Sequence, residues 1–233
     1  MPGRYAARYL PAAASVIKDF AARHGSRLIV PEIPDDITDK GLLGNEFYYR
    51  GMNIKVPLAG HHQVGNAATA IEAVLAAFPD LPPSAIENGI ANVRFPARCE
   101  VISREPLVLL DGSHNPNGTA ALDGLLNSCG INNAVCIAGF MADKDVKDAF
   151  LNVASHFKKA ITVTVKSNSR SMTAIELAHV CKNCGCDAMP AEGYDKAIEM
   201  ALSYGAPLIV FGSLYLAGDI RPLLLSRFST KDY

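Results

Sequence analysis

The sequence predicts an α/β fold with a mostly parallel sheet, and three observations support that class. Two short segments, residues 108–110 and 208–210, are continuously apolar, as expected of parallel strands that helices cover on both faces. From about residue 95 onward, strand-like runs alternate with helix-like runs. Hydrophobic residues make up 49% of the 233 and charged residues 19%, which is a globular composition with enough length for a buried core.

The elements before residue 95 do not follow that alternation. Gly51 separates two short strand-like runs and so predicts a β-hairpin, while Ser84 followed by Glu87 predicts a capped helix start. The expected elements are a helix at 12–22, a strand at 27–30, hairpin strands at 45–49 and 53–56, and helices at 63–78 and 84–92. This part of the chain therefore looks like the end of a different structural unit.

After residue 95 the expected elements form an α/β series. The expected strands are 99–102, 107–110, 134–138, 160–165 and 207–211, and the expected helices are 118–126, 146–156, 173–182, 194–204 and 214–227. Ligands bind beyond the carboxyl ends of the strands in such sheets. Four polar or glycine-rich segments follow strands there, and we expect binding residues in them: 111–117, 139–145, 166–171 and 212–218.

The charge and hydropathy of the chain exclude several classes of partner. The formal net charge of −1 provides no basic field for nucleic acid. No apolar run reaches the ~18–20 residues needed to span a bilayer. The first residues are basic and rich in alanine, but they favour an amphipathic helix over a cleaved targeting peptide. We therefore expect a cytoplasmic monomer that binds neither nucleic acid nor membranes.

The cysteine-rich segment from His179 to Cys186 permits two interpretations. Imidazole and thiolate are zinc ligands, and Cys181, Cys184 and Cys186 lie close together in the sequence. No second ligand cluster follows at zinc-finger spacing, however. We favour the end of a helix that buries small thiols, and we expect no metal ligands in this chain.

The segment from Leu110 to Gly118 leaves a buried strand and enters a helix. Asp111 at the strand exit can accept hydrogen bonds from ribose hydroxyls or orient a cation, and the amino end of the helix attracts anions. His114 could hold a phosphate or carboxylate oxygen. The alternative is a helix-capping turn with His114 in solvent, and the spacing alone does not decide between the two.

Two further candidates lie outside that segment. Arg98 lies at the junction of the two regions, where its guanidinium could clamp a phosphate between domains or merely hold the linker through a salt bridge. Asn66 and Gln63 are three residues apart at a helix start, so both amides can face one ligand such as an adenine edge. Without further context, a capped helix start with His61 and His62 exposed is the better interpretation.

Six short motifs resemble those of the folylpolyglutamate synthases. In order they are Gly60-x-His62-Gln63-x-x-Asn66-Ala67, Phe95-Pro96-Ala97-Arg98-x-Glu100-Val101, Leu110-Asp111-Gly112-Ser113-His114-Asn115-Pro116, Met141-Ala142-Asp143-Lys144-Asp145-Val146, Asn168-Ser169-Arg170-Ser171 and Gly212-Ser213-Leu214-Tyr215. Each motif is loose alone, but six in register across nearly the whole chain are specific. The family includes dihydrofolate synthases and belongs with the Mur ligases, in which a central P-loop ATPase domain precedes a Rossmann-like carboxyl-terminal domain.

The resemblance implies a role for each matched position. Asn66 matches the asparagine near the adenine, Arg98 the catalytic arginine that reaches an ATP phosphate, and Asp111 the aspartate that holds ATP. His114 and Ser213 match positions in the active site that handle glutamate.

One further motif and one departure from the family pattern carry different implications. Residues 143–145 match a motif with a structural or interfacial role. Ala97 stands where the family usually has glycine, a change that we expect to restrict the backbone slightly.

The P-loop pattern G-x-x-x-x-G-K-[ST] does not occur in this sequence. The resemblance therefore implies that the phosphate cradle and the Mg²⁺ ligands lie upstream of this chain. Residues 1–92 would be the carboxyl-terminal remnant of the central ATPase domain, and residues 93–233 the glutamate ligase domain.

The implied function is part of an ATP- and Mg²⁺-dependent ligase that joins L-glutamate to folate or dihydropteroate through an acyl phosphate. We expect the chain alone to be inactive. Two alternatives stay open: a non-catalytic nucleotide-binding or interaction module derived from this fold, and another Mur-type amino-acid ligase. The choice of acceptor also stays open, because the pterin-contacting residues are expected upstream.

Overall fold

The computed structural model describes residues 11–228, with the side chains of residues 14–228. The chain divides into two compact units. In the described range, unit 1 comprises residues 11–57 and 61–94, and unit 2 comprises residues 58–60 and 95–228. The main transition lies between Arg94 and Phe95, and the division of the chain into family domains after residue 92 stays a prediction.

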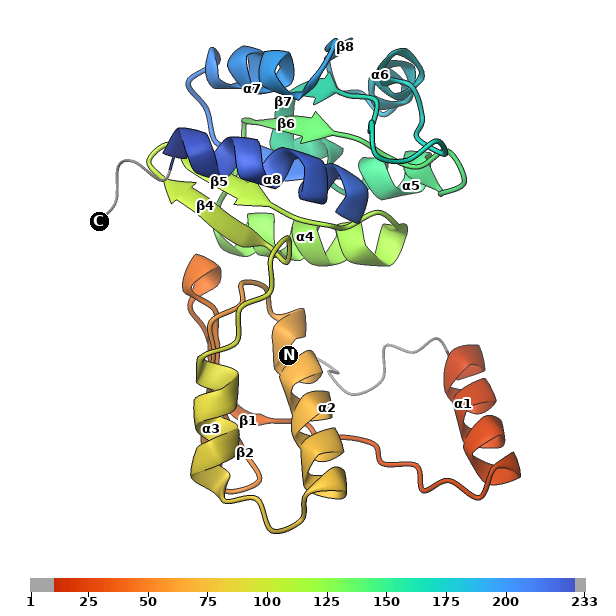
Figure 1. Cartoon of the computed structure of the whole chain (residues 1–233), viewed down its shortest axis with the longest axis vertical. Helices are drawn as coiled ribbons and strands as arrows, with labels where there is room; N and C mark the ends of the chain where they lie inside the picture. The colour runs from red at the N-terminus through yellow and green to blue at the C-terminus, as the bar shows by residue number, and fades with distance from the viewer. Residues whose placement is uncertain (1–10, 229–233) are drawn as a thin grey trace. The chain divides into compact units, whose positions relative to one another are not determined.

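Unit 1 contains a small antiparallel sheet and three helices (Figure 1). Its elements are α1 (Pro11–Arg23), β1 (Asp35–Asp39), a 3-10 turn (Gly41–Leu43), β2 (Asn45–Tyr49), β3 (Met52–Val56), α2 (His62–Ala77) and α3 (Pro83–Ala91). The strand order is β1-β2-β3, and the predicted hairpin is confirmed, with Tyr49 paired to Met52 around Gly51. Alternate residues of β2 and β3 are buried, so the sheet has one covered face, against which α2 and α3 pack.

Two predictions for unit 1 are wrong, and one strand was not predicted. Residues 27–30 form no strand, and Leu28 and Val30 are exposed with no neighbouring strand to pair with. The polar segment that forms β1 was not expected, because its pairing with β2 is made by backbone groups and not by an apolar face. Ser84 does not cap α3, since Pro82 occupies the N-cap position.

Unit 2 is an α/β domain with a six-stranded sheet. Its strands are β4 (Glu100–Arg104), β5 (Leu107–Leu110), β6 (Ala134–Ala138), β7 (Phe157–Thr162), β8 (Ala188–Pro190) and β9 (Leu208–Phe211), in the spatial order β4-β5-β9-β6-β7-β8. Only β4 runs antiparallel to its neighbour. The helices are α4 (Pro116–Ser128), α5 (Val146–Leu151), α6 (Ala174–Asn183), α7 (Tyr194–Leu202) and α8 (Leu214–Phe228). The predicted mostly parallel sheet is therefore confirmed.

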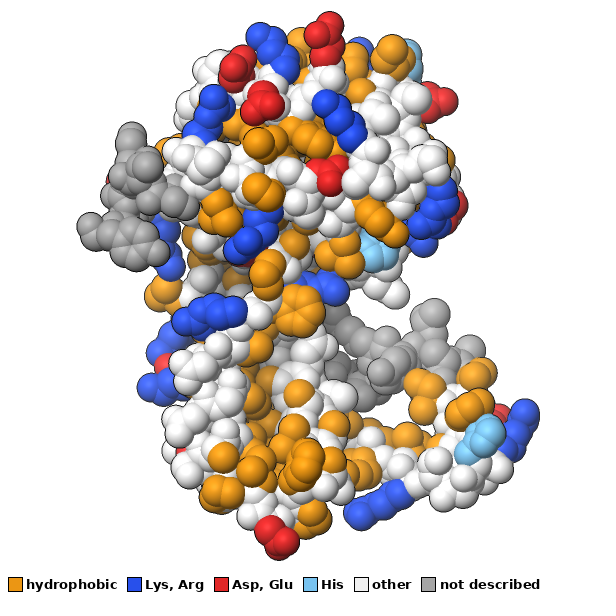
Figure 2. All heavy atoms as spheres, viewed as in Figure 1, with side chains coloured by type: hydrophobic (Ala, Val, Ile, Leu, Met, Phe, Trp, Pro, Cys, Tyr) orange, Lys and Arg blue, Asp and Glu red, His pale blue; other side chains and the backbone are white. Residues whose placement is uncertain are grey.

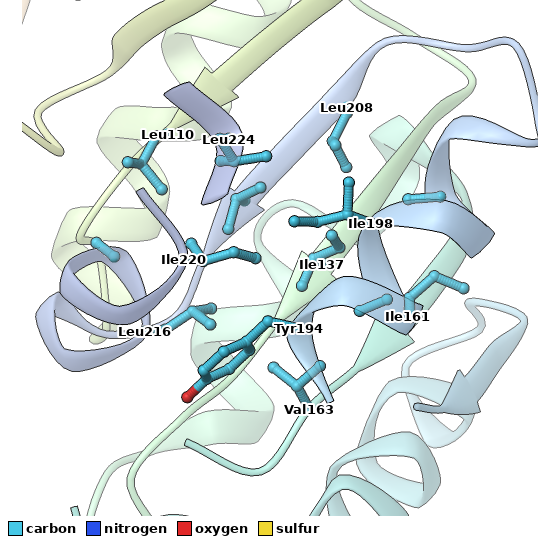
Figure 3. Close-up of a cluster of buried hydrophobic side chains, with 14 of the residues drawn as sticks. Leu110, Ile137, Ile161, Val163, Tyr194, Ile198, Leu208, Leu216, Ile220 and Leu224 are labelled. Atoms are coloured by element: carbon cyan, nitrogen blue, oxygen red, sulfur yellow. The ribbon is translucent and has the colours of Figure 1, made fainter. Parts of the chain in front are cut away.

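Helices cover both faces of this sheet. On one face, side chains from the parallel strands pack against α7 and α8, in a buried cluster that includes Ile137, Ile161, Ile198 and Ile220 (Figure 3). On the other face Phe211 stacks with Phe150 and Phe157 and meets the edge of Phe140. Continuous burial along β6 and β9 explains why their sequences are apolar without alternation.

Two element predictions in unit 2 need correction. The expected helix 146–156 ends at Leu151, and a separate 3-10 turn (Ala154–His156) follows it. Strand β8 was not predicted, because three residues carry too little pattern to be recognised. At α6, by contrast, Thr173 and Glu176 form a complete capping box at the predicted helix start.

The cysteine-rich segment lies at the end of α6. Cys181 and Cys186 are buried, and Cys184 is half-buried at the C-cap. Within residues 11–228 no group of three or more His, Cys, Asp and Glu side chains is arranged to hold a metal ion. No helix in the described part of the chain is long and apolar enough to cross a membrane.

Candidate functional site

The strand order of unit 2 brings four predicted binding segments to one edge of the sheet. Strands β5, β9, β6 and β7 are successive neighbours and parallel, so their carboxyl ends point the same way. The segments that follow them therefore lie in the order 111–117, 212–218, 139–145 and 166–171. This edge is where an open parallel sheet binds ligands.

Asp111 is buried at this edge of the sheet, with 6% of its surface exposed. Its Oδ2 accepts hydrogen bonds from the backbone N–H of Cys99 (2.9 Å) and from the Cys99 thiol (3.3 Å). Its Oδ1 accepts one from the N–H of Ser113 (2.8 Å). The carboxylate thus ties the segment before β4 to the loop after β5. Burial is the main cause that raises the pKa of the Cys99 thiol, and the nearby Asp111 charge adds to it.

His114 is half-buried at the entry to α4. Its Nδ1 lies 3.0 Å from the carbonyl oxygen of Gly112, so Nδ1 must carry the proton that makes this hydrogen bond. In the neutral ring Nε2 is then left as an acceptor. Asn115 caps the helix by accepting a hydrogen bond from Gly118 N–H (2.8 Å). The capping turn and an available imidazole nitrogen therefore coexist, although the sequence presented them as alternatives.

Ser213 follows β9, next to the loop that carries His114. The residue is 3% exposed, and its Oγ accepts a hydrogen bond from Leu216 N–H (3.0 Å) in the first turn of α8. The two loops are joined by Gly212 N–H, which donates to Ser113 O (2.9 Å). Gly212 has a φ of +120° and a Cβ there would lie 2.7 Å from Gly139 O, so only glycine fits this close approach.

Arg98 lies in a turn directly before β4 and belongs to the same edge. Its guanidinium carbon lies 5.5 Å from the centre of the Phe95 ring, a cation–π contact. The turn is joined to the Asp111 loop through Gly112 N–H, which donates to Ala97 O (2.8 Å). Ala97 has a φ of +58°, a left-handed conformation that explains why glycine suits this position.

Asn66 lies in unit 1, near the start of α2. Its Nδ2 donates to Gln63 Oε1 (2.9 Å), and Gln63 Nε2 lies 3.0 Å from His62 Nε2. The two amides therefore bond to each other, which holds the exposed Asn66 in one orientation.

The segments after β6 and β7 are joined to each other. Arg170 Nη1 donates to Asp143 Oδ2 (3.0 Å), and Ala142 N–H donates to Arg170 O (2.8 Å). Asp145 caps α5 by accepting from Asp148 N–H (3.3 Å). These contacts give the 143–145 motif a structural explanation.

Four residues that support this edge were not predicted from the sequence: Tyr194, Asp219, Glu100 and Arg221. Tyr194 donates to Asp219 (2.6 Å) and accepts from Lys166 N–H (2.8 Å), which fixes the segment after β7. Glu100 and Arg221 form a bidentate ion pair beside the Arg98 turn. Glu100 belongs to the motif at residues 95–101, so the sequence contains a signal for it. Arg221 pairs with Glu100 across 121 residues and carries no local signal.

Unit 2 is an α/β domain of the doubly wound kind, with an arginine, a carboxylate, an imidazole and a hydroxyl at the carboxyl ends of its parallel strands. Residues 97–214 match the family model described as Mur ligase, glutamate ligase domain. The chain belongs to this family.

Two relatives illustrate the match at sequence level. The chain is 31% identical to a folylpolyglutamate synthase of Lacticaseibacillus casei over 195 residues, which are 78% of this chain and 44% of that protein. It is 30% identical to the dihydrofolate synthase/folylpolyglutamate synthase of Escherichia coli, covering 76% of this chain and 41% of that protein. The chain thus spans less than half the length of these relatives and matches their carboxyl-terminal portion.

Solved structures agree in fold. A Mycobacterium tuberculosis folylpolyglutamate synthase complexed with ADP superposes with a TM-score of 0.82 at 24% identity, covering 92% of this chain and 53% of that one. A folylpolyglutamate synthase from Thermotoga maritima superposes with a TM-score of 0.73 at 26% identity, covering 94% and 53%.

Proposed function

We propose that this chain is the carboxyl-terminal part of an ATP-dependent ligase that joins L-glutamate to folate or dihydropteroate. The observation that carries the proposal is the grouping of Arg98, Asp111, His114 and Ser213 at one edge of unit 2, in a chain of the Mur ligase family. The names of the 31% and 30% identical relatives, a folylpolyglutamate synthase and a dihydrofolate synthase/folylpolyglutamate synthase, support the choice of substrates.

In this proposal residues 93–233 are the glutamate ligase domain and residues 1–92 are the remnant of a central ATPase domain. The family match over residues 97–214 supports the first assignment. The absence of a P-loop pattern from the 233 residues means that the phosphate cradle would be supplied by a different segment. The Mg²⁺ ligands are assigned to that segment too, as the resemblance to the folylpolyglutamate synthases implies.

ATP is assigned to Arg98, Asp111 and Asn66. The guanidinium of Arg98 can make a charge-assisted, bidentate contact with a phosphate. Asp111 already accepts three hydrogen bonds from its own chain, which hold the backbone of the proposed ATP site. Its remaining lone pairs can accept hydrogen bonds from ATP. Asn66, oriented by Gln63, retains an amide oxygen and an N–H for the adenine edge.

Glutamate is assigned to His114 and Ser213. With Nδ1 bonded to Gly112 O, His114 Nε2 can accept a proton from the attacking amine. Ser213 Oγ accepts from Leu216 N–H, and its own hydroxyl proton can be donated to a substrate carboxylate.

The proposed chemistry has two steps. An oxygen of the acceptor carboxylate bonds to the γ-phosphorus of ATP and ADP leaves, which forms an acyl phosphate. The glutamate nitrogen then attacks the acyl carbon, inorganic phosphate leaves, and an amide remains. Arg98 offsets the negative charge that develops on the transferred phosphate, and Mg²⁺ would supply further charge neutralisation there.

The test is a ligase assembled from this chain and a P-loop-bearing amino-terminal segment, with Arg98→Ala as the main variant. Losing a charge-assisted phosphate contact costs about 2–4 kcal/mol, so we expect turnover to fall roughly a hundredfold while the melting temperature changes little. Asp111→Asn keeps the shape and removes the charge. Arg104→Ala, at an exposed arginine of β4, is the matched control, and the 233-residue chain alone is the inactive blank.

An Arg98→Ala enzyme that is unstable yet fully active per folded molecule would refute the catalytic role. ADP formation from ATP, glutamate and folate by the 233-residue chain alone would refute the assignment of the phosphate cradle to another segment.

A second candidate function is a different Mur-type amino-acid ligase. The observation in its favour is 34% identity over 116 residues, or 49% of this chain, to a UDP-N-acetylmuramoyl-tripeptide–D-alanyl-D-alanine ligase of Treponema pallidum. Acceptor specificity in the assembled ligase separates the two, because only a folate ligase should join glutamate to folate or dihydropteroate.

A further inference from the structure

The turn that carries Arg98 is held by a carboxylate on each side. The N–H of Ala97, the residue before Arg98, donates to Glu100 Oε2 (3.0 Å). The N–H of Cys99, the residue after it, donates to Asp111 Oδ2 (2.9 Å). Arg98 therefore lies in a short turn whose two ends accept support from different side chains.

This turn must be held by other residues because its backbone is strained. Ala97 and Cys99 have φ values of +58° and +47°, and neither is glycine. A residue with a Cβ is unfavourable in the left-handed conformation, so two such residues in one turn persist only where the surroundings hold them. Release of either end would let the turn relax and would move Arg98.

Glu100 is itself fixed by α8. Arg221 places Nε 2.9 Å from Oε2 and Nη2 2.7 Å from Oε1 of Glu100, the forked geometry of a bidentate ion pair. Burial acts to raise the pKa of Glu100, but the hydrogen bonds from Arg221 and from Ala97 N–H outweigh it and lower that pKa below its usual value. Glu100 is therefore a charged acceptor at neutral pH. It is held by α8, the last helix of the unit.

We infer that Glu100 and Arg221 form a positioning pair that sets the placement of Arg98 for its phosphate contact. Glu100 contacts the turn through the Ala97 N–H, so the pair acts on Arg98 through the backbone of the turn. Asp111 holds the Cys99 side of the turn, and its neighbour Gly112 adds a hydrogen bond to Ala97 O (2.8 Å). The catalytic part of this inference rests on the proposed function of Arg98, whereas the effect on the turn does not.

The first arm of the test measures amide hydrogen exchange by NMR on the 233-residue chain. In Arg221→Met we expect the Ala97 amide to exchange about tenfold faster. This ratio corresponds to a loss of about 1.4 kcal/mol in the free energy of local opening. The Cys99 amide, held by Asp111, should keep its exchange rate. Glu100→Gln should give a similar response, and Arg221→Lys, which keeps the charge but not the fork, a smaller one.

Lys159→Met is the matched control, since it breaks a Lys159–Asp187 ion pair of 2.7 Å elsewhere in the same unit. It should leave the Ala97 amide unchanged. If Arg221→Met lowers the melting temperature without changing Ala97 exchange, the pair is a general structural tie and the inference is wrong.

The second arm uses the assembled ligase. Arg221→Met should lower kcat about tenfold with little change in KM for the amino acid, and should have no further effect in an Arg98→Ala background. Additive losses in the double variant would overturn the positioning role. If Ala97 exchange responds but Arg98→Ala retains full turnover, the assigned catalytic role of Arg98 fails while the control of the turn by Glu100 and Arg221 stands.

Discussion

The strands of unit 2 are buried on both faces, whereas those of unit 1 are buried on one. Every residue of β6 and β9 is buried, while β2 and β3 alternate between buried and exposed positions. Unit 1 also exposes large apolar side chains outside its sheet, among them Val16 (66%), Phe20 (63%) and Val30 (62%). Figure 2 shows hydrophobic side chains at the surface of the helix at lower right, which is α1 in Figure 1.

This difference indicates that the two units are unequal in independent stability. A sheet with helices on both faces excludes water from all its strands, so unit 2 contains its own complete core. Unit 1 has a smaller core and leaves an apolar surface uncovered, which is typical of a surface that binds another protein segment.

The largest difference that we expect between the units is in sensitivity to proteases. Limited proteolysis should cut unit 1 first and leave a stable fragment that begins near residue 93, because cleavage follows local unfolding. Mass spectrometry of the fragments reports the boundary. Preferential survival of the amino-terminal piece would contradict the comparison.

Phe211→Ala should weaken unit 2 alone. Phe211 is fully buried and contacts Phe140, Phe150 and Phe157, and truncation of such a side chain costs about 3–5 kcal/mol. Denaturant unfolding followed by hydrogen exchange gives the loss for each unit. Leu151→Ala, at an exposed position of the same unit, is the control and should change stability by less than about 0.5 kcal/mol. Equal loss of protection in both units would mean that they unfold as one body.

Each unit has a buried tyrosine that should weaken it at alkaline pH. Burial, together with the hydrogen bonds to Glu72 and Asp219, raises the pKa values of Tyr49 and Tyr194 from 10.0 to about 12. A raised pKa means that the folded state holds the proton more tightly, so this stabilisation is complete below pH 10 and is lost as the pH rises to about 12.

Denaturant melts over that pH range provide the measurement. Tyr49→Phe should remove the alkaline loss from unit 1 and Tyr194→Phe from unit 2, with Tyr48→Phe, at an exposed position, as the control. An unchanged alkaline profile in either buried-site variant would show that its phenol does not titrate with unfolding.

The smallest effect that we expect is a gain in stability from Ala97→Gly. Relief of the left-handed strain at Ala97 should raise the free energy of unfolding by about 1–2 kcal/mol. The greater conformational freedom of glycine in the unfolded chain should lower it by about 0.5–1 kcal/mol. The net gain should be about 0.5–1 kcal/mol in thermal melts. Ala70→Gly, on the exposed face of α2, should change stability in the opposite direction by a similar amount. A loss of stability in Ala97→Gly would show that the turn is not strained.

The sequence by itself determined the elements that carry a strong local pattern. Strand 134–138 is predicted to the residue, because a run buried on both faces must be apolar throughout. The hairpin around Gly51 and the Thr173 helix start are equally local, since turn and cap chemistry involve neighbours in the chain. The polar strand β1 and the three-residue β8 escape prediction, because backbone pairing with a partner forms them.

Only the tertiary structure decided which of the candidate residues lie together. The parallel pairing of β5 with β9 places Ser213 beside the loop of His114, although about a hundred residues separate them. The same is true of Glu100 and Arg221, whose ion pair spans 121 residues and supports the Arg98 turn. Strand order and long-range ion pairs depend on contacts that form only when the whole sheet assembles, and no short stretch of sequence contains that information.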